Sequence, residues 1–381
     1  MPRFLFISHD GFGLGHVRRN CLIASSLRTM HRQADVMIVT GISTEIGWLG
    51  GPGLSIVRVP PMIKTSRHGY EGLSYSFEET VRKRRDMFVD VVTSWQPDVV
   101  VVDRHPYGVA GELRPGIEAA IDQGAGTVLG LRDVLDEPEV VRQELTGEGW
   151  AEVTELYSKI LVYGAPGFCD HRAEYGLPID PVYCGWVVEP VKPVPVEPRL
   201  LVIAGGGGGD GSDVFALGVS VLERMEGWRG ALIAGPFADA RCLSQLMDCS
   251  PARGRIAVHT NVAGCSRWFA PAAAVLQMAG YNSTFEALQA GIRPVLLPRW
   301  QPRQEQLIRA RLLAERGLAE VVGDDTDAGE VARLLSRSER LSSSALKAAG
   351  LECNGARRTA EILVQLARRV RPHLPRGART R

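Results

Sequence analysis

A glycine-rich segment that ends in a histidine is the first part of the chain able to do chemistry. The apolar run Arg3–Ser8 leads into HDGFGLGH (residues 9–16), after which an amphipathic pattern begins. Glycine has no side chain, so at Gly13 and Gly15 the backbone can turn tightly and bring its N–H groups close to a ligand. His16 stands at the expected start of a helix and could take a proton from a hydroxyl as a general base. A histidine that only caps or packs the helix start is the alternative, and the local sequence leaves both open.

The same glycines could belong to a dinucleotide-binding site. That fingerprint is G-x-G-x-x-G, and its third glycine allows close packing of the helix on the strand. Counted from Gly11, the sixth position is His16, and counted from Gly13 it is Arg18. The third glycine is missing, so the sequence argues against a dinucleotide site.

An aspartate follows the most apolar strand pattern of the first half. Asp103 comes directly after Asp98–Val102, whose four valines predict a buried strand. A carboxylate at the carboxyl end of such a strand could orient His16 and stabilise its protonated form. The alternative is an aspartate that caps the next turn, with Arg104 as its partner.

A second glycine run follows a strand pattern in the other half of the chain. Residues 204–211 read AGGGGGDG and precede a helical pattern. A diphosphate lying against main-chain N–H groups would require such bare backbone, and a P-loop is excluded because no Gly-Lys-Ser/Thr follows. A flexible loop between domains is the alternative. The candidate phosphate-binding residues are Gly205, Gly206, Gly207 and Gly208.

The segment 275–318 carries hydroxyls, a glutamate and an amide at two expected helix starts. Ser283 and Thr284 could offer hydroxyl and N–H groups to a phosphate. Glu286, one turn further, could accept two hydrogen bonds from a ribose diol. Glu305 and Gln306 begin the next helix, and a carboxylate beside an amide suits sugar hydroxyls.

Strand and helix patterns alternate along the chain, which predicts parallel α/β sheets. The expected strands are Arg3–Ser8, Asp35–Thr40, Ser55–Val59, Asp98–Val102, Gly126–Leu131, Lys159–Tyr163, Arg199–Ala204, Gly230–Ala234, Arg255–His259, Ala273–Gln277 and Arg293–Leu297. The expected helices include His16–Met30, Tyr75–Trp95, Ser283–Ala290 and Gln304–Arg316.

A proline-rich segment divides this pattern into two halves. Residues 189–198 contain four prolines, which fix φ and remove backbone donors, so the segment predicts a semi-rigid linker. We expect an N-terminal acceptor-binding domain over 1–188, a C-terminal donor-binding domain over 199–369 and a disordered basic tail over 370–381. Because ligands bind at the carboxyl ends of parallel strands, two such domains facing each other would form a cleft for group transfer.

Composition limits the function classes. The formal net charge of +1 gives no global field that would recruit nucleic acid. The seven cysteines are scattered without a C-x-x-C spacing, which favours a reduced, cytoplasmic protein over a zinc or disulfide framework. No apolar run reaches the roughly 18 residues that span a bilayer, so we expect no integral membrane segment, although peripheral membrane contact stays open.

Several of these motifs together resemble glycosyltransferase family 28, the family of the bacterial N-acetylglucosaminyltransferase that forms lipid II. The resemblance rests on Gly280 through Glu286, the Ala290-Gly291-x-x-Pro294 that follows, the Glu305-Gln306 pair and the N-terminal Gly13-x-Gly15-His16. It implies a GT-B fold of two Rossmann-like domains and an inverting enzyme that uses a nucleotide diphosphate sugar. Related plant and antibiotic glycosyltransferases pair a histidine in the first loop with an aspartate after a later strand, as His16 and Asp103 would.

The resemblance also implies a donor site in the C-terminal domain. By it, Ser283 and Thr284 contact the diphosphate, Glu286 the ribose, and Glu305 and Gln306 the sugar. Further donor-binding positions implied by the motif are Val262, at which the family reads the base through its backbone, Gly280 and Asn282. This chain departs from the family at Glu305, where the lipid-II enzyme has an amide, and at Asn261, where an aromatic residue is usual.

The expected function is transfer of a sugar from a UDP- or dTDP-sugar to an acceptor hydroxyl. No cofactor or metal is expected, because no Asp-x-Asp suits a divalent ion and the helix start and hydroxyls could stabilise the leaving diphosphate. One rival is a nucleotide-sugar epimerase of the same architecture, whose product would form without an acceptor. The other is a non-catalytic nucleotide-sugar binder, which would never release nucleotide. A small molecule, a lipid-linked sugar and a glycan all stay open as acceptor.

Overall fold

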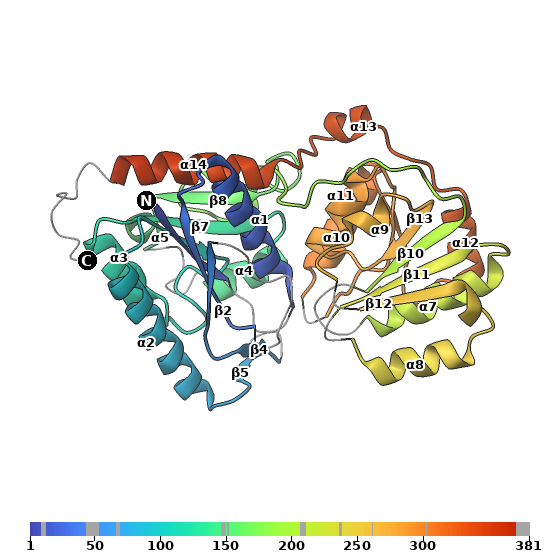
Figure 1. Ribbon diagram of the computed structural model, residues 1–381, viewed down its shortest axis with the longest axis horizontal. Helices are drawn as coiled ribbons and strands as arrows, with labels where there is room; N and C mark the ends of the chain where they lie inside the picture. Colours follow the sequence, from blue (N-terminus) through green and yellow to red (C-terminus); the bar gives the residue numbers. More distant parts are fainter. Residues whose placement is uncertain are drawn as a thin grey trace. The chain divides into compact units, whose positions relative to one another are not determined.

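The computed structural model describes most of the chain as two compact units (Figure 1). The first unit contains residues up to Val187 together with the segment from Asn354 onward, and the second unit contains Val188–Cys353. The described residues are 1–8, 13–42, 53–65, 69–145, 150, 152–205, 211–235, 238–260, 262–301 and 303–370.

The first unit is built on a parallel sheet with the order β3-β2-β1-β6-β7-β8-β9. Its strands are β1 (Arg3–Ser8), β2 (Asp35–Thr40), β3 (Leu54–Arg58), β6 (Val99–Asp103), β7 (Gly126–Arg132), β8 (Lys159–Tyr163) and β9 (Val182–Tyr183). A short antiparallel hairpin pairs β4 (Met62–Lys64) with β5 (Tyr70–Gly72). The strand order reverses direction between β1 and β6, and in open α/β sheets such a switch point is where ligands bind.

Helices pack on both faces of this sheet because its central strands are apolar on both sides. All five residues of β6 are buried. Leu5 and Ile7 of β1 belong to a core cluster with Phe88 and Ile117 of the helices on one face, and alternate strand residues point to the opposite face. The helices are α1 (Gly15–Met30), α2 (Phe77–Trp95), α3 (Arg114–Asp122), α4 (Pro138–Leu145), α5 (Val153–Leu156), α6 (His171–Tyr175) and α14 (Gly355–Val370).

The second unit repeats the same plan with the strand order β12-β11-β10-β13-β14-β15, again with parallel neighbours. Its strands are β10 (Leu200–Ala204), β11 (Arg229–Ala234), β12 (Ile256–Thr260), β13 (Ala274–Gln277), β14 (Val295–Leu296) and β15 (Glu320–Val321). The order reverses between β10 and β13. Gly218 of α7 lets that helix approach β10 closely, because a Cβ there would lie 2.6 Å from Ile203.

The helices of the second unit also cover both faces of its sheet. They are α7 (Ser212–Arg224), α8 (Ala240–Cys249), α9 (Ser266–Phe269), α10 (Tyr281–Gln289), α11 (Glu305–Glu315), α12 (Ala328–Ser336) and α13 (Ser343–Ala348), with a 3₁₀ turn at Arg253–Arg255. Val214 and Val331 pack on the face that Leu201 presents, whereas Phe269 and Ala287 pack on the face of Val202. The prediction of two Rossmann-like α/β domains is therefore confirmed.

One helix differs from the sequence-based division of the chain. Helix α14 lies inside the expected C-terminal domain of 199–369, but the structure places it in the first unit, beside α1 (Figure 1). The physical reason is its apolar stripe: Leu363, Val364 and Leu366 are buried, and the Leu366 side chain fills the space beside Gly126 of β7. Residues 371–381 of the expected tail lie outside the described part of the chain.

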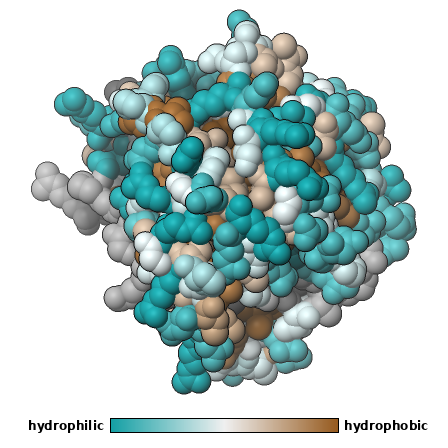
Figure 2. Space-filling model, turned by 90° about the vertical axis from the view of Figure 1, so that its right-hand side faces the viewer, coloured by the Kyte–Doolittle hydropathy of each residue, from teal (hydrophilic) through white to brown (hydrophobic). Residues whose placement is uncertain are grey.

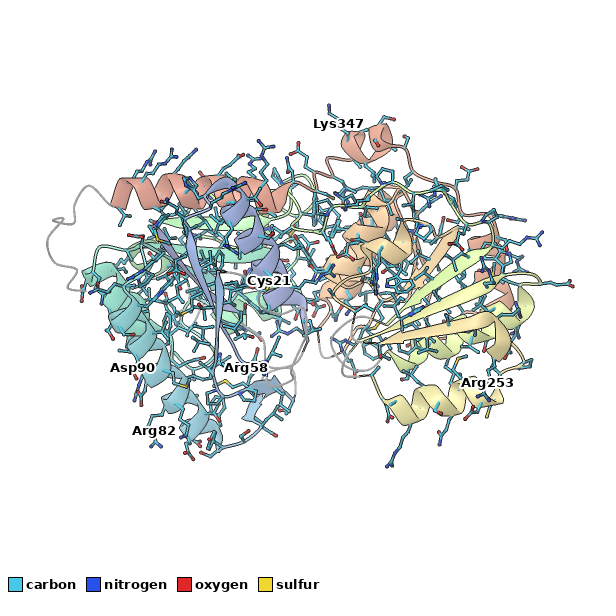
Figure 3. All side chains as sticks on the ribbon, in the orientation of Figure 1. Cys21, Arg58, Arg82, Asp90, Arg253 and Lys347 are labelled. Carbon is cyan, nitrogen blue, oxygen red and sulfur yellow. The ribbon has the colours of Figure 1, made fainter. Side chains whose placement is uncertain are left out.

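Many charged side chains lie on the surface of the described residues. Arg82 and Asp90 of α2 are exposed (Figure 3). Arg84, within the same basic run, is buried instead, and its Nε lies 3.5 Å from a carboxylate oxygen of Glu112. On the face shown in Figure 2, hydrophilic residues predominate and hydrophobic ones form small separate patches. Within the described residues, no helix has both the length and the apolar character needed to cross a bilayer.

Candidate functional site

Most of the residues predicted from the sequence follow strands at the two switch points. In the first unit, the loop after β1 carries Gly13 and Gly15, and Asp103 ends the neighbouring strand β6. Gly13 has a φ of 102°, which a residue with a side chain rarely adopts, so glycine is required there. Gly15 is exposed and begins α1. Residues 9–12, including Gly11, lie outside the described part of the chain.

His16 and Asp103 form a hydrogen-bonded pair. The Nδ1 atom of His16 lies 2.8 Å from Oδ2 of Asp103, which is 2% exposed. A carboxylate only accepts hydrogen bonds, so Nδ1 carries the proton and donates it to Asp103. In the neutral ring, this tautomer leaves the basic lone pair on Nε2, the atom that a general base uses. The side chain of His16 is 14% exposed.

A buried arginine completes this site, and it was not expected from the sequence. Nη2 of Arg19 donates to Oδ1 and Oδ2 of Asp103 at 2.7 and 2.5 Å, and it lies 3.1 Å from Nδ1 of His16. The i, i+3 spacing of His16 and Arg19 puts both on one face of a helix, which was the available signal. Arg104, the partner considered for Asp103, instead donates to the carbonyl of Leu135.

Burial and neighbouring charge set the protonation states. Burial lowers the pKa of His16 from 6.5 to about 4; the Asp103 carboxylate opposes this shift, and the cations Arg132 and Arg19 add to it. Burial alone would raise the pKa of Asp103, but Arg19 and His16 hold it well below its usual range. At neutral pH the site therefore consists of a neutral imidazole beside a charged carboxylate–guanidinium pair.

The guanidinium of Arg19 packs against the ring of Tyr163, and Gly130 leaves the space that this ring occupies. Its guanidinium carbon lies 4.9 Å from the centre of the Tyr163 ring on β8, within the range of a cation–π contact. A Cβ at Gly130 of β7 would lie 2.4 Å from Oη of Tyr163. The ring can occupy this place only because residue 130 has no side chain.

The loop after Asp103 is strained and polar. Arg104 is a buried non-glycine residue with a φ of 71°, a conformation that costs energy and is found often at functional sites. His105 follows it, and its Nε2 lies 3.4 Å from Oη of Tyr70 on β5. The β4–β5 hairpin, which the sequence did not predict, thus contacts the loop that follows Asp103.

In the second unit, Gly205 directly follows β10 and is buried. A Cβ there would lie 2.2 Å from the ring of Phe215 on α7, so packing of that ring also requires glycine at this position. Gly206, Gly207 and Gly208 lie outside the described residues, and the prediction that they bind phosphate stays a prediction.

The start of α10 follows β13, the strand next to β10. Gly280 is its N-cap residue, and Asn282 is half-buried. Ser283 is 8% exposed, and its hydroxyl lies 3.5 Å from the carbonyl of Gly280. Thr284 is fully buried, and its hydroxyl has no hydrogen-bond partner among the described residues. Both hydroxyl side chains are therefore buried, and their contact with a diphosphate stays a prediction.

Glu286 is fully buried, and its Oε2 accepts the backbone N–H of Cys265 at 2.8 Å. This bond fixes the loop between β12 and α9, where half-buried Val262 packs on the core. Glu286 thus has a structural role in the described state. Ribose binding by Glu286 and base recognition at Val262 stay predictions.

Glu305 and Gln306 begin α11 as expected. Glu305 is half-buried, and Oε1 of Gln306 accepts the backbone N–H of Arg299 at 3.3 Å. One turn further, the fully buried Arg309 donates to the carbonyl of Ala279 at 2.9 Å. The positive charge of Arg309 therefore lies beside Ala279, just before α10, a contact that no sequence pattern indicated.

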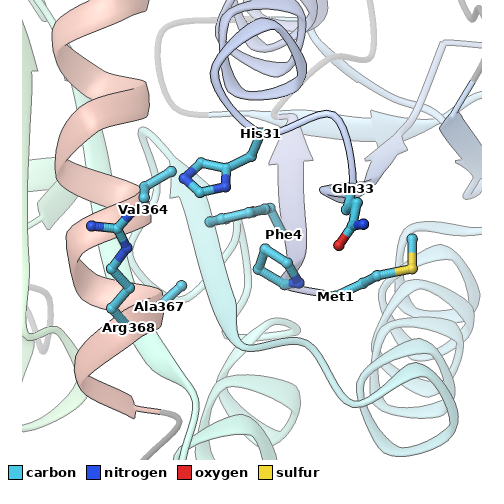
Figure 4. Close-up of a pocket in the computed structure, with 8 residues that line it drawn as sticks. Met1, Phe4, His31, Gln33, Val364, Ala367 and Arg368 are labelled. Atoms are coloured by element: carbon cyan, nitrogen blue, oxygen red, sulfur yellow. The ribbon is translucent and has the colours of Figure 1, made fainter.

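A cavity of about 230 Å³ lies elsewhere in the first unit (Figure 4). Its lining includes Phe4 near the start of β1, His31 after α1, and Val364 and Arg368 of α14. Gly13 and His16 follow the opposite end of β1, so this cavity is separate from the candidate site.

No grouping of three histidine, cysteine, aspartate or glutamate side chains that could hold a metal ion occurs among the described residues. The sequence has one Asp-x-Asp, at 325–327. There Asp327 accepts the N–H groups of Gly329 and Glu330 at 2.8 and 3.3 Å and caps α12.

Comparison of the structure with solved structures shows that the fold is that of the GT-B glycosyltransferases. The chain is similar to SnogD from Streptomyces nogalater, with 19% identity, a TM-score of 0.61 and coverage of 96% of this chain and 99% of that one. For Acinetobacter baumannii MurG the identity is 13%, the TM-score 0.53 and the coverage 98% and 100%. For Medicago truncatula UGT71G1 complexed with UDP-glucose the values are 11%, 0.58, 96% and 98%. The GT-B fold expected from the resemblance is confirmed.

No family model matches the sequence, and a search of curated proteins finds no significant match.

Proposed function

We propose that the chain is an inverting glycosyltransferase that moves a sugar from a UDP- or dTDP-sugar to an acceptor hydroxyl. The observation that carries this proposal is the His16–Asp103 hydrogen bond at the switch point of the first sheet. A neutral histidine with its basic nitrogen opposite an oriented carboxylate is suited to remove a proton from a hydroxyl. The GT-B fold supports the same assignment by analogy.

In the proposed reaction, Nε2 of His16 takes the acceptor proton as the acceptor oxygen forms a bond to the anomeric carbon. The bond from that carbon to the diphosphate oxygen breaks, and its electron pair leaves with the diphosphate. One displacement inverts the anomeric configuration. The proton then passes from His16 to solvent, which restores the neutral ring.

The second unit would bind the donor. The start of α10 offers backbone N–H groups and the helix dipole to the diphosphate, and Arg309 behind it adds positive charge at Ala279. Gly205 through Gly208 would line the same phosphates, with Glu286 on the ribose, Val262 at the base, and Glu305 and Gln306 on the sugar. We propose that this charge stabilisation serves in place of a divalent ion, because the single Asp-x-Asp caps a helix.

The first test is donor binding. Because the Medicago truncatula structure contains UDP-glucose, the panel starts with UDP-glucose, followed by UDP-N-acetylglucosamine, dTDP-glucose and UDP alone, each with EDTA. The correct donor raises the apparent stability by about 2.7 kcal/mol at 100 times its Kd. A panel in which no nucleotide shifts the melting temperature contradicts the donor assignment.

The second test is transfer. With the donor found, release of nucleoside diphosphate is measured with phenolic, sugar and lipid-linked acceptors, and the anomeric configuration of the product is read by NMR. His16→Ala should lower kcat by about 10²–10⁴-fold while donor binding is unchanged. An unchanged kcat contradicts the base assignment. Epimerised donor formed without acceptor identifies the epimerase instead, and donor binding without nucleotide release identifies a binder.

A further inference from the structure

The side chain of Arg19 contacts both His16 and Asp103, the two residues of the proposed general base. It is fully buried, its Nη2 reaches both oxygens of Asp103, and the same atom lies 3.1 Å from Nδ1 of His16. Because Nδ1 of His16 donates to Asp103, the 3.1 Å approach of Nη2 is not a hydrogen bond; it places the positive charge of Arg19 directly beside the imidazole.

We propose that Arg19 is a positioning residue: its hydrogen bonds fix the orientation of Asp103, which accepts from Nδ1–H of His16, and its positive charge keeps the His16 imidazole neutral. The inference rests on the proposed function, since presentation of Nε2 matters only where His16 removes a proton. Arg19 itself touches no reacting atom.

The geometry explains how Arg19 can both orient Asp103 and act on the protonation state of His16. Asp103 has two oxygens, and Oδ2 is shared between the N–H of Arg19 and Nδ1–H of His16. The carboxylate cannot rotate away from the imidazole without breaking its bonds to Arg19. The Tyr163 ring also contacts the guanidinium, which further restricts the movement of the Arg19 side chain.

The charges around His16 show what Arg19 changes. Among the described residues, the groups that face it are Asp103 from β6, Arg19 from its own helix and Arg132 from β7. An Asp–His pair without other charges favours the protonated imidazole. Here Arg19 and Arg132 counter that attraction, so a neutral base is ready at neutral pH instead of a protonated one.

The test is NMR of the protein labelled with ¹⁵N-histidine, without ligand. The His16 signals are assigned by their loss in His16→Gln, and both the tautomer at pH 7 and the titration midpoint are read directly. Wild type should show the Nδ1–H tautomer and a midpoint well below 6.5. In Arg19→Met the midpoint should rise by about one pH unit or more, a tenfold change in the protonation equilibrium.

Arg19→Lys is the matched control, because lysine keeps the charge on a chain about as long as methionine. Its His16 midpoint should stay near that of wild type. If Arg19→Met fails to fold, Arg19→Gln supplies a neutral side chain that can still donate to Asp103. A neutral variant whose midpoint and tautomer equal those of wild type overturns the proposal. A lysine variant that shifts as far as the neutral one also overturns it, because packing and not charge would then be the cause.

Turnover separates this inference from the proposed function. In an active enzyme, the acid limb of the kcat–pH profile should move upward in the neutral variant, while the KM for the donor changes little. If the NMR midpoint moves as expected but wild type turns over no sugar nucleotide, the proposed function fails and the control of His16 by Arg19 stands.

Discussion

Acidification should destabilise the first unit, and the structure predicts how much of that loss comes from His16. The folded-state pKa of His16 is lowered from 6.5 to about 4, so between these values the unfolded chain binds a proton that the folded chain does not. Stability therefore rises with pH across this window and is lost as pH falls from 6.5 to 4. Above pH 6.5 both states are neutral at this residue, and below pH 4 both are protonated.

The magnitude follows from the size of that pKa difference. At about 1.4 kcal/mol for each pH unit, the loss is about 2 kcal/mol at pH 5 and about 3 kcal/mol at pH 4. The pKa of Asp103 is depressed as well, and its stabilisation is lost only as pH falls below the ordinary carboxyl range. The two groups therefore act in separate pH windows.

The assay compares wild type with His16→Gln, whose amide still donates to Asp103 but does not titrate. Urea unfolding is carried out at pH 4, 5, 6 and 7. Hydrogen exchange in peptides from α1 and β6 serves as its readout, so that the unfolding of the first unit is measured separately. The difference in unfolding free energy between the two proteins should shrink by about 3 kcal/mol from pH 7 to pH 4. A difference that stays constant with pH refutes a neutral, buried His16.

Three further substitutions test other contacts by their effect on stability. Asp103→Asn should cost about 3–5 kcal/mol in urea unfolding, because the charge of Arg19 stays buried without its partner; adding Arg19→Met should recover part of that loss. Gly130→Ala should cost about 1–3 kcal/mol by thermal melting, because the new Cβ meets Oη of Tyr163 at 2.4 Å and the nearest ring carbons at 3.0 Å. Glu286→Ala should cost about 1–3 kcal/mol in urea unfolding, since the half-buried backbone N–H of Cys265 loses its acceptor.

Each of these has a control. Gly167→Ala adds a Cβ that meets nothing within 4 Å, so its melting temperature should match wild type; an equal loss at both glycines would contradict the steric argument. Glu286→Gln keeps an acceptor oxygen and should retain most of the stability lost in the alanine variant. If the Asp103→Asn and Arg19→Met losses simply add, the two side chains are not coupled as described.

The sequence by itself determined the repeated α/β plan, and it predicted which residues would follow the strands at the switch points. Valine-rich runs such as 99–102 predict buried strands wherever they occur, because burial of both faces demands apolar residues in succession. Each expected strand agrees with an observed one within about two residues, and β1, β2 and β8 have the expected bounds, whereas the short strands β4, β5, β9 and β15 were not expected. His16 and Asp103 could be paired in advance because a parallel sheet brings its strand ends to one edge.

Other features were decided only by the tertiary structure, because they depend on contacts between residues far apart in the chain. Nothing in the local sequence distinguishes Arg19 from the other arginines of its helix. Its role depends on β6 and β8, which bring Asp103 and Tyr163 into contact with it. Helix α14 follows the second unit in sequence, yet its apolar stripe packs on α1 and β7. Burial of Glu286 against the Cys265 N–H also depends on how α10 packs beside a distant loop. Local patterns encode the period of an element and its buried face, whereas the identity of the partner depends on how the whole chain packs.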